Sequence, residues 1–390
     1  MRREVIFKEK KKNKAGGAFA LVGLLIGLAC WIPALYGEFL SLDFLFENFG
    51  FLGTEVIFIA LVFLAHITSI IIHEAGHLVF GLLSGYGFCS FRIFSFIFMT
   101  TDEGIKLKRY SIPGTAGQCL LTPPELKDGK MPTALYNIGG SLLGFVAFAI
   151  FAFGASITEA YPIINIFFVL SAAANLSVAL TNAIPLRTAM INNDGMNAIS
   201  LGKNPDAIKA LRMQLLCNAE SSRGVSIADM PEEWFVMPED DKLGDALVSS
   251  CAYFCAARCF ARGEYDKAKE IIEHLFEVDA SVIGVHRAHM IVDLGFIAAI
   301  NGDVKEAHRI FKREYPEFSR SLRNNLCALR SRYAYELLIK RSEKGAKRIL
   351  ILMNMLSGKL NNYAFVQELE HEARLIEYVD SLYAARIKNA

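Results

Sequence analysis

The sequence has almost no net charge, and its charged residues are few. Lys and Arg number 41 and Asp and Glu 40, a net charge of +1. The chain therefore lacks the basic excess that a nucleic-acid partner requires, and we expect no such partner. Charged residues make up 21% of the chain and hydrophobic residues 53%, compared with about 25% and 45–50% in soluble globular domains. Long apolar runs precede residue 200, whereas about two thirds of the Lys and Arg follow it. This asymmetry excludes a disordered chain and an ordinary soluble enzyme, and it predicts a membrane half joined to a water-soluble half.

The cysteines include no C-x-x-C pair, although there are eight of them. That spacing would be typical of zinc-binding loops and redox sites. Cys251, Cys255 and Cys259 are spaced so that a helix would place them on one face. Ordinary buried thiols are the common reason for such a pattern, and a thiol cluster or metal site is the alternative. Unpaired cysteines in this number fit a reducing cytosol.

Long apolar runs are confined to the N-terminal half. Residues 1–16 are basic, and the run after them is longer than a signal-peptide core, with no small-x-small cleavage site, so it predicts an uncleaved transmembrane helix. We expect four such helices, at about residues 17–36, 55–84, 132–157 and 161–186. Lys and Arg are absent from the loop 37–54 but present in the loop 85–131, which predicts that both termini are cytosolic. The chain is thus expected to be a multi-pass protein of the cell membrane, with the lipid bilayer around residues 17–203.

The loop 85–131 contains an aromatic stretch, from Phe91 to Phe98, that is too short to span a bilayer. Two structures are open for it. It forms either a β-hairpin that dips into the membrane where protein satisfies its backbone, or a loop packed on the membrane surface.

The composition changes after the membrane half. Residues 204–243 predict a linker with a short helix, and residues 244–390 predict a cytosolic helical domain. The sequence Gly263–Ala268 recurs as Gly302–Ala307, and a degenerate copy ends at Ala346, so these alanines stand 39 residues apart. The pattern resembles tetratricopeptide-type helix hairpins, which implies a peptide or protein partner. The expected fold class is all-α: a polytopic helical membrane domain followed by a soluble α-helical hairpin-repeat domain.

The segment His73-Glu74-Ala75-Gly76-His77 lies inside the second apolar run. On a helix, His73 and His77 share one face, so both imidazoles can reach one ion, and Zn²⁺ suits this ligand type. Glu74 can then serve as the general base that takes a proton from water and passes it to the leaving amine. Ionisable groups inside a bilayer cost about 2.5–3.5 kcal/mol each, and a cation would compensate for all three. The alternative is a trio that is hydrogen-bonded to neighbouring helices and binds no metal.

Two imidazoles and a base leave one protein ligand of the metal to be found. Asp194, just beyond Pro185, is the leading candidate, because a carboxylate at the start of a short helix is easily aimed and Gly195 leaves room beside it. Pro185 can end the fourth apolar helix and so turn the backbone toward the metal. Asp102 is the weaker candidate, and a surface turn or helix cap is the alternative role of Asp194.

Four motifs follow one another between about residues 55 and 200. They are the HEAGH sequence of residues 73–77, the glycine-rich segment Gly139–Gly144, Asn182-x-x-Pro185 and Asp194-Gly195. In this order they resemble the site-2 protease family, which are intramembrane zinc metalloproteases. The resemblance implies that His73, His77 and Asp194 bind zinc. It also implies that Glu74 is the general base and that Asn182 helps to hold the substrate or the oxyanion. The chain departs from the family in a longer spacing between Pro185 and Asp194, and in Gly140-Ser141 where the family has Gly-Pro.

The expected function is that of an intramembrane zinc metalloendopeptidase. It would cleave a membrane-bound protein or peptide near the cytosolic side, and the helical domain would recruit the substrate or a partner. The alternative is a catalytically inactive membrane anchor whose helical-repeat domain binds a partner protein. A transporter is disfavoured, because no inverted repeats are evident.

Overall fold

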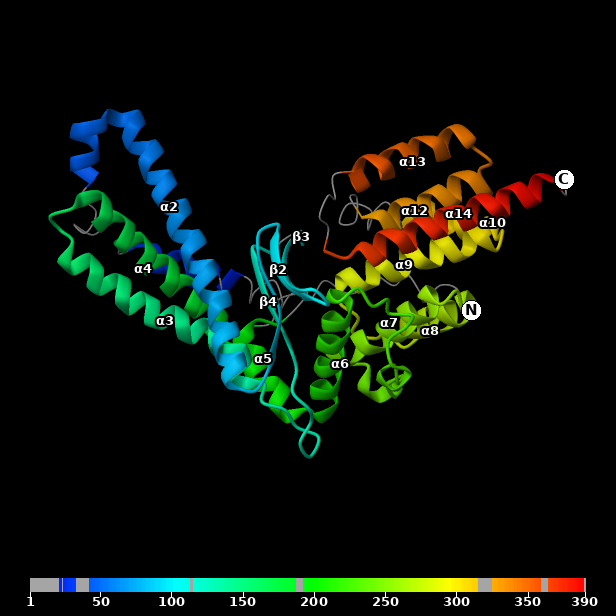
Figure 1. Ribbon diagram of the computed structural model, residues 1–390, viewed down its shortest axis with the longest axis horizontal. Coiled ribbons are helices and arrows are strands. Elements are labelled where there is room, and N and C mark those ends of the chain that lie inside the picture. Colours follow the sequence, from blue (N-terminus) through cyan, green and yellow to red (C-terminus); the bar gives the residue numbers. More distant parts are fainter. Residues whose placement is uncertain are drawn as a thin grey trace. The chain divides into compact units, whose positions relative to one another are not determined.

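The computed structural model describes residues 21–22, 24–32, 42–112, 115–186, 192–314, 325–358 and 364–388. Figure 1 shows a mostly helical chain with one small sheet. It divides into two compact units. The N-terminal unit comprises the described residues of 9–98 and 111–208, and the C-terminal unit those of 99–110 and 209–390.

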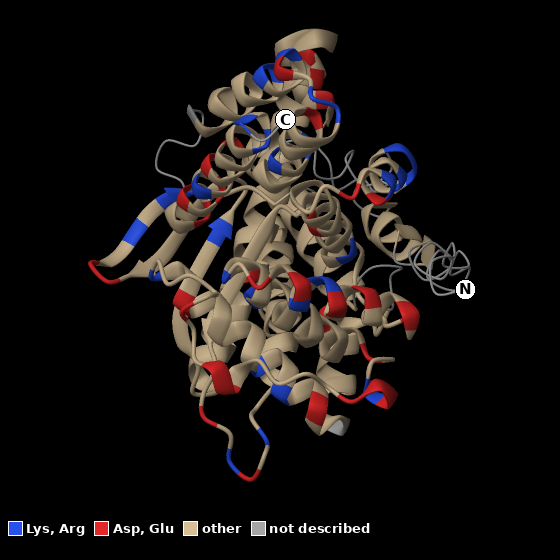
Figure 2. Cartoon of the chain, turned by 90° about the vertical axis from the view of Figure 1, so that its right-hand side faces the viewer, with Lys and Arg blue, Asp and Glu red and all other residues tan. Residues whose placement is uncertain are grey.

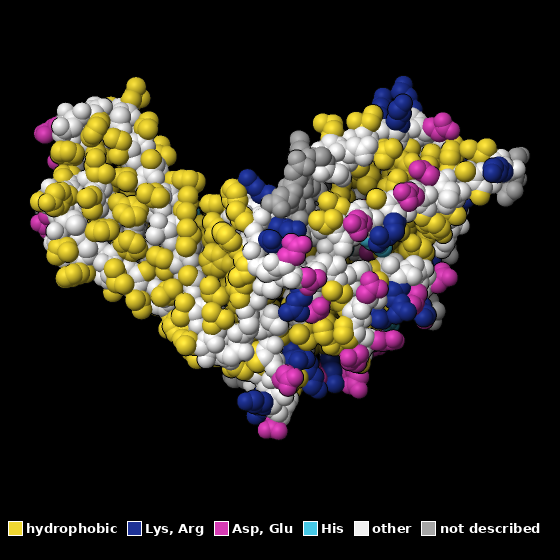
Figure 3. Space-filling model, viewed as in Figure 1, with side chains coloured by type: hydrophobic (Ala, Val, Ile, Leu, Met, Phe, Trp, Pro, Cys, Tyr) yellow, Lys and Arg dark blue, Asp and Glu magenta, His cyan; other side chains and the backbone are white. Residues whose placement is uncertain are grey.

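Three helices of the N-terminal unit are long and apolar enough to cross a membrane, among the residues that the structure describes. They are α2 (Leu42–Leu83), α3 (Ala134–Ile157) and α4 (Pro162–Ala183). Their outer surfaces are apolar, and Figure 3 shows mainly hydrophobic side chains on the visible face of this unit. This confirms the prediction of membrane-length helices for three of the four apolar runs. The run 17–36 is described only at 21–22 and 24–32, which are helical.

The second apolar helix begins earlier than predicted. Helix α2 starts at Leu42, so most of the loop expected at 37–54 is helical. Gly50 interrupts the helix with φ 64°, a backbone conformation that glycine adopts at little cost. The aromatic residues on both sides of Gly50 extend the apolar surface, and Leu45 is fully buried against α4.

Small residues let these helices approach closely. A Cβ atom on Gly76 of α2 would lie 2.3 Å from the Gly139 carbonyl oxygen of α3, so the two backbones touch. Close backbone contact of this kind is what drives helix packing in lipid, where burying apolar surface gains nothing. It brings the HEAGH segment against the glycine-rich segment of α3.

The expected all-α fold class is wrong in one respect, because the segment 87–122 forms a four-stranded sheet. The strands are β1 (Gly87–Ile93), β2 (Phe96–Thr101), β3 (Gly104–Arg109) and β4 (Gly117–Thr122), in the order β3-β2-β1-β4. β1 and β4 are antiparallel, with Gly87 opposite Thr122 and Ile93 opposite Gly117. Strand pairing satisfies the backbone of this apolar stretch, and β4 packs on α2. In β2, Ile97 is buried while Phe96 and Phe98 are exposed.

Apart from the strand residues within 99–110, the described part of the C-terminal unit is mainly helical. Its main helices are α6 (Pro205–Ser222), α7 (Ala246–Ala261), α8 (Tyr265–Glu277), α9 (Gly284–Ile300), α10 (Val304–Arg309), α12 (Leu326–Ala334), α13 (Glu343–Gly358) and α14 (Val366–Lys388). Short 3₁₀ or π segments lie at Glu232–Trp234, Asp240–Lys242, Ile310–Glu314 and Tyr335–Ile339. Within the predicted linker 204–243, α6 packs Met213 and Cys217 against Cys251 of α7. Figure 2 shows the positions of basic and acidic residues interspersed along these helices.

The alanines of the sequence repeat occupy buried positions. Ala268, Ala307 and Ala346 are 0, 0 and 3% exposed, on α8, α10 and α13. Gly263 and Gly302 precede the first two with φ of 77° and 71°, the left-handed backbone that a tight turn between helices needs. The small side chain and the turn glycine recur together, which is why the sequence repeats. The tetratricopeptide likeness itself stays a prediction.

An arginine with two carboxylates lies in the core of the C-terminal unit. Arg330 of α12 is 2% exposed and donates to Asp293 (2.7 Å) and Glu372 (3.0 Å), while its guanidinium carbon lies 4.8 Å from each of the Phe260 and Phe296 ring centres. One guanidinium cannot neutralise two buried carboxylates, so the second favours its protonated form. Burial accordingly raises the pKa of Glu372 to about 7.

Candidate metal centre

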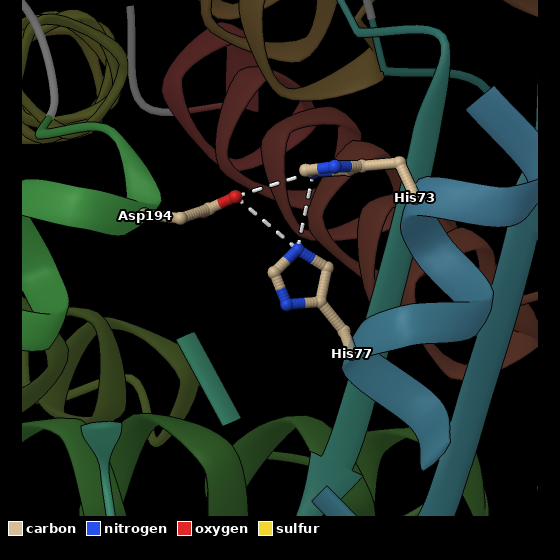
Figure 4. Close-up of side chains that lie close together, drawn as sticks. All are labelled: His73, His77 and Asp194. Atoms are coloured by element: carbon tan, nitrogen blue, oxygen red, sulfur yellow. Dashed lines mark hydrogen bonds and ion pairs between the residues drawn. The ribbon is translucent and has the colours of Figure 1, made fainter. Parts of the chain in front are cut away.

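His73 and His77 are presented by the last turns of α2. Four residues apart, they lie on the face of the helix that meets α3, and each is 9% exposed. Figure 4 shows both rings turned toward Asp194. The sequence puts the pair on one face, and the glycine contact between α2 and α3 buries that face.

Asp194 reaches the two histidines because it is the first residue of α5 (Asp194–Ser200), which begins beside them after α4 has ended. Asn193 caps α5 by accepting from the Met196 N–H (3.0 Å), and its Oδ1 also accepts from the Leu186 N–H (3.0 Å). Its Nδ2 donates to the carbonyls of Thr181 (2.8 Å) and Ile184 (2.7 Å) at the end of α4. One side chain therefore joins the two helix ends and fixes where Asp194 begins.

One side-chain atom from each of His73, His77 and Asp194 lies at a corner of a nearly equilateral triangle. His73 Nε2 and His77 Nε2 are 3.2 Å apart, and Asp194 Oδ2 lies 3.2 Å from the first and 3.3 Å from the second. A tetrahedral zinc ion with bonds of about 2.0–2.1 Å has ligand atoms about 3.3 Å apart. The triangle thus has the size of one face of a zinc tetrahedron. Within the described residues, this is the group of His, Cys, Asp and Glu side chains that could hold a metal.

The Nδ1 atoms of the two histidines indicate whether their Nε2 atoms are available to a cation. His77 Nδ1 donates to the Tyr136 carbonyl oxygen (2.8 Å). Because that carbonyl can only accept, the proton of His77 is on Nδ1 and the lone pair of Nε2 points at the triangle. Backbone carbonyls commonly orient metal-binding histidines in this way. His73 Nδ1 is buried and, in the described part of the chain, has no hydrogen-bond partner. Two imidazoles converging on one carboxylate oxygen fit a shared cation.

Glycines make the space around the triangle. A Cβ on Gly140 would lie 2.6 Å from His73 Cε1 and 2.8 Å from His77 Nε2, and a Cβ on Gly195 would lie 2.1 Å from the Ala183 carbonyl oxygen. Real Cβ atoms do not come this close to other atoms, so both positions require glycine. The backbones of α3 and α5 form a cradle that larger residues would fill.

Glu74 lies on the sheet side of the triangle. A Cβ on Gly117, the first residue of β4, would lie 2.6 Å from Glu74 Oε1. The same carboxylate is within electrostatic range of the three triangle residues and of Arg92. Arg92 is 1% exposed and donates to the carbonyls of Phe94 (2.7 Å) and Gly117 (3.1 Å). The buried guanidinium therefore holds the start of β4 against the Glu74 side chain.

The sequence named two further candidates, Asn182 as a substrate or oxyanion residue and Asp102 as the weaker third ligand. Asn182 Nδ2 donates to the Val178 carbonyl (2.9 Å) within α4. The Asn182 backbone approaches α5, because a Cβ on Gly195 would lie 2.9 Å from the Asn182 carbonyl oxygen. Asp102, the weaker candidate for the third ligand, is exposed in the turn between β2 and β3 and is not part of the triangle.

The three cysteines of α7 do not form a metal group among the described residues. Cys251 and Cys255 are buried in the packing between helices. Burial raises the pKa of both thiols to about 12, so they stay protonated at neutral pH. They behave as small apolar residues of the core.

Three further residues support the site and were not singled out from the sequence. They are Asn193, which joins α4 to α5, Tyr136, whose carbonyl orients His77, and Arg92, which holds β4. Asn193 carried a readable signal, since Asn before Asp-Gly is a typical helix N-cap. Tyr136 acts through its backbone carbonyl and Arg92 through the sheet, so the sequence carried no readable signal for either residue.

Comparisons with known proteins gave no match: no family model, curated protein or solved structure resembles this chain closely enough to be reported. The geometry of the site therefore carries the functional argument.

Proposed function

We propose that the chain is an intramembrane zinc metalloendopeptidase, similar in its motifs to the site-2 protease family. The observation that carries the proposal is the triangle of His73, His77 and Asp194, with sides of 3.2–3.3 Å. It lies at the end of a helix long and apolar enough to cross a membrane. Three protein ligands leave a fourth tetrahedral position open, as in catalytic rather than structural zinc sites.

Imidazole nitrogens with one carboxylate oxygen are a donor set typical of zinc hydrolases. Bound there, zinc would polarise a peptide carbonyl and lower the pKa of water. The remaining work falls to the chain itself. His77 is held by the Tyr136 carbonyl, and Asp194 by the Asn193 junction, so two of the ligands are oriented before any metal arrives.

Glu74 is the proposed general base. It follows a proposed ligand directly in sequence, but its side chain lies against Gly117, outside the triangle. A carboxylate beside the metal, and not bound to it, is free to accept a proton from water and to return it to the leaving amine. Gly117 leaves room for this carboxylate because it has no side chain.

The substrate is proposed to be a membrane-bound protein or peptide that is extended at the site. β1 is paired on both sides, so a substrate strand cannot add to it, whereas β4 is an edge strand of the sheet. An extended segment beside β4 would have its backbone close to Glu74, and an exposed strand edge binds such segments through main-chain hydrogen bonds. A helical substrate would have to unwind locally.

Cleavage is proposed to occur near the cytosolic side of a cell membrane, with both chain termini in the cytosol. The distribution of Lys and Arg between the loops supports this orientation. The C-terminal helices would recruit the substrate or a partner protein.

The test compares wild type with Glu74→Gln and with Glu55→Gln, a control on the same helix. We expect one zinc per chain in all three. Membrane peptides that are cut in cells carrying wild type or Glu55→Gln should accumulate uncut with Glu74→Gln.

Absence of stoichiometric zinc from the purified wild type would favour the inactive anchor. Full cleavage by Glu74→Gln would refute the general-base role while leaving the metal site standing.

A further inference from the structure

The outer face of α13 is both basic and apolar. Its inner face, with Ala346, Ile349 and Met353, is buried in the core of the C-terminal unit. The outer face begins with the exposed basic residues Lys344, Lys347 and Arg348. It ends with Ile351, Leu352 and Met355, which are 52, 39 and 57% exposed. Figure 3 shows basic and hydrophobic side chains along this helix, at the top right.

These six residues share one side of the helix. At 100° per residue they fall within an arc of about 140°, and the three buried residues lie opposite. The basic and apolar groups are thus presented to the same surface. Scattered exposed apolar residues need no explanation, but adjacent ones beside cations point to a binding face.

The three cations have no acidic partner in the part of the chain that the structure describes. The nearest acid in sequence, Glu343, accepts a hydrogen bond from the Tyr383 hydroxyl (3.0 Å) instead. Some basic residues of this unit are paired with acids, for example Lys340 with Glu336 (2.8 Å) and Lys267 with Glu264 (2.8 Å). The charge on the outer face of α13 is therefore available to an external anion.

We propose that the outer face of α13 docks on the anionic surface of the membrane. Lipid headgroups supply phosphate charges for the cations, and the boundary with the acyl chains accepts Ile351, Leu352 and Met355. The same chain carries three helices long and apolar enough to cross a membrane, so the unit that contains α13 is covalently tethered to segments that a bilayer would hold. The inference is independent of the proposed peptidase activity.

A bilayer fits this face better than a protein does. The apolar residues are at one end of the face and the cations at the other, whereas a protein interface typically places its apolar residues at the centre of a polar rim. A helix that binds a membrane surface combines basic side chains with apolar side chains that enter the bilayer only a short way. Each cation near an anionic surface adds to the affinity.

The test is hydrogen exchange of the full chain in nanodiscs, read on peptides from α13. In discs with a third of anionic phosphatidylglycerol, α13 should exchange about tenfold more slowly than in phosphatidylcholine discs. Lys347→Glu with Arg348→Glu should abolish this difference, whereas Lys312→Glu with Arg313→Glu, a neighbouring exposed basic pair, should keep it. Ile351→Ser with Met355→Ser, which leaves all charges in place, should weaken it.

Exchange of α13 that is the same in both discs would overturn the proposal. So would equal protection in detergent without lipid, which would indicate a protein occupant. Protection that rises with protein concentration would indicate a second copy of the chain and would also overturn it.

Discussion

The space beside the Gly140 backbone is too small for a side chain of any other residue. Its missing side chain is what allows the rings of His73 and His77 to lie beside the backbone of α3. We predict that Gly140→Ala lowers zinc affinity by one to two orders of magnitude, because a Cβ would displace both imidazoles.

The matched control is Gly202→Ala in the same unit, where a Cβ would meet nothing within 4 Å. Competition with a fluorescent zinc chelator measures both variants. Equal zinc affinities for Gly140→Ala and Gly202→Ala would show that the backbone around the triangle can move to accept a Cβ at position 140.

The buried environment of Glu372 leads to a second prediction, which concerns the pH dependence of stability. Its pKa is raised by burial from 4.5 to about 7, so the folded chain holds this proton more tightly than the unfolded chain does. Between these pH values the unfolded carboxyl ionises first, and the stabilisation present at low pH is lost as pH rises. Relative to Glu372→Gln, wild type should lose stability around α14 between pH 4.5 and 7, on the order of 3 kcal/mol.

Hydrogen exchange of α14, corrected for its intrinsic pH dependence, measures this difference. His371, whose pKa is lowered by burial to about 4, changes stability in the opposite direction, but it is present in both chains and cancels. A difference between the chains that is flat across this pH range would contradict the charge assignment.

At the scale of elements, the junction of α4 and α5 decides where Asp194 lies. Asn193→Ala removes four hydrogen bonds at once, three to the end of α4 and the residues just after it and one to the first turn of α5. We predict a 10- to 100-fold loss of zinc affinity, the usual cost of removing a residue that orients a ligand.

Asn165→Ala is the control, since Asn165 also joins α4 to a neighbouring helix by donating to the Ala155 carbonyl (2.7 Å). It should destabilise the fold without changing zinc affinity. Zinc binding that survives Asn193→Ala unchanged would mean that Gly195 and Pro185 suffice to place the carboxylate.

The elements differed in how well the sequence predicted them. Long apolar runs identified α2, α3 and α4, because only membrane-length helices combine that length with so few charges. The sheet was one of two open alternatives, since Phe91–Phe98 is apolar on both faces and lacks the alternation that marks a strand.

The residues of the triangle, too, could be predicted only in part from the sequence. His73 and His77 could be paired from their spacing alone, while the position of Asp194 depends on a junction that no periodicity encodes. The role of Asn182 rests on the resemblance alone and stays a prediction; its Nδ2 donates to the Val178 carbonyl one turn back.

At the scale of the whole molecule, a metal should stabilise one unit and not the other. His73, His77 and Asp194 all belong to the N-terminal unit. We predict that a zinc chelator destabilises this unit by up to about 4 kcal/mol, the linkage expected for a ligand present at a thousand times its dissociation constant. The C-terminal unit should be unchanged.

Hydrogen exchange resolved by peptide tests this with a single sample. Chelation should speed exchange at the end of α2 and in α5, and leave α9 and α12 as they were. Faster exchange in both units would show that the metal also stabilises residues outside the N-terminal unit.

The order in which the chain is made has a consequence at the triangle. The two imidazoles on α2 are synthesised early, whereas Asp194 follows His77 by 117 positions, after α3 and α4. Bringing such distant residues together has a loop-closure entropy that must be overcome first. If the proposed function is right, the growing polypeptide would lack the third ligand until α5 docks, so it would have no peptidase activity while α2, α3 and α4 are being made.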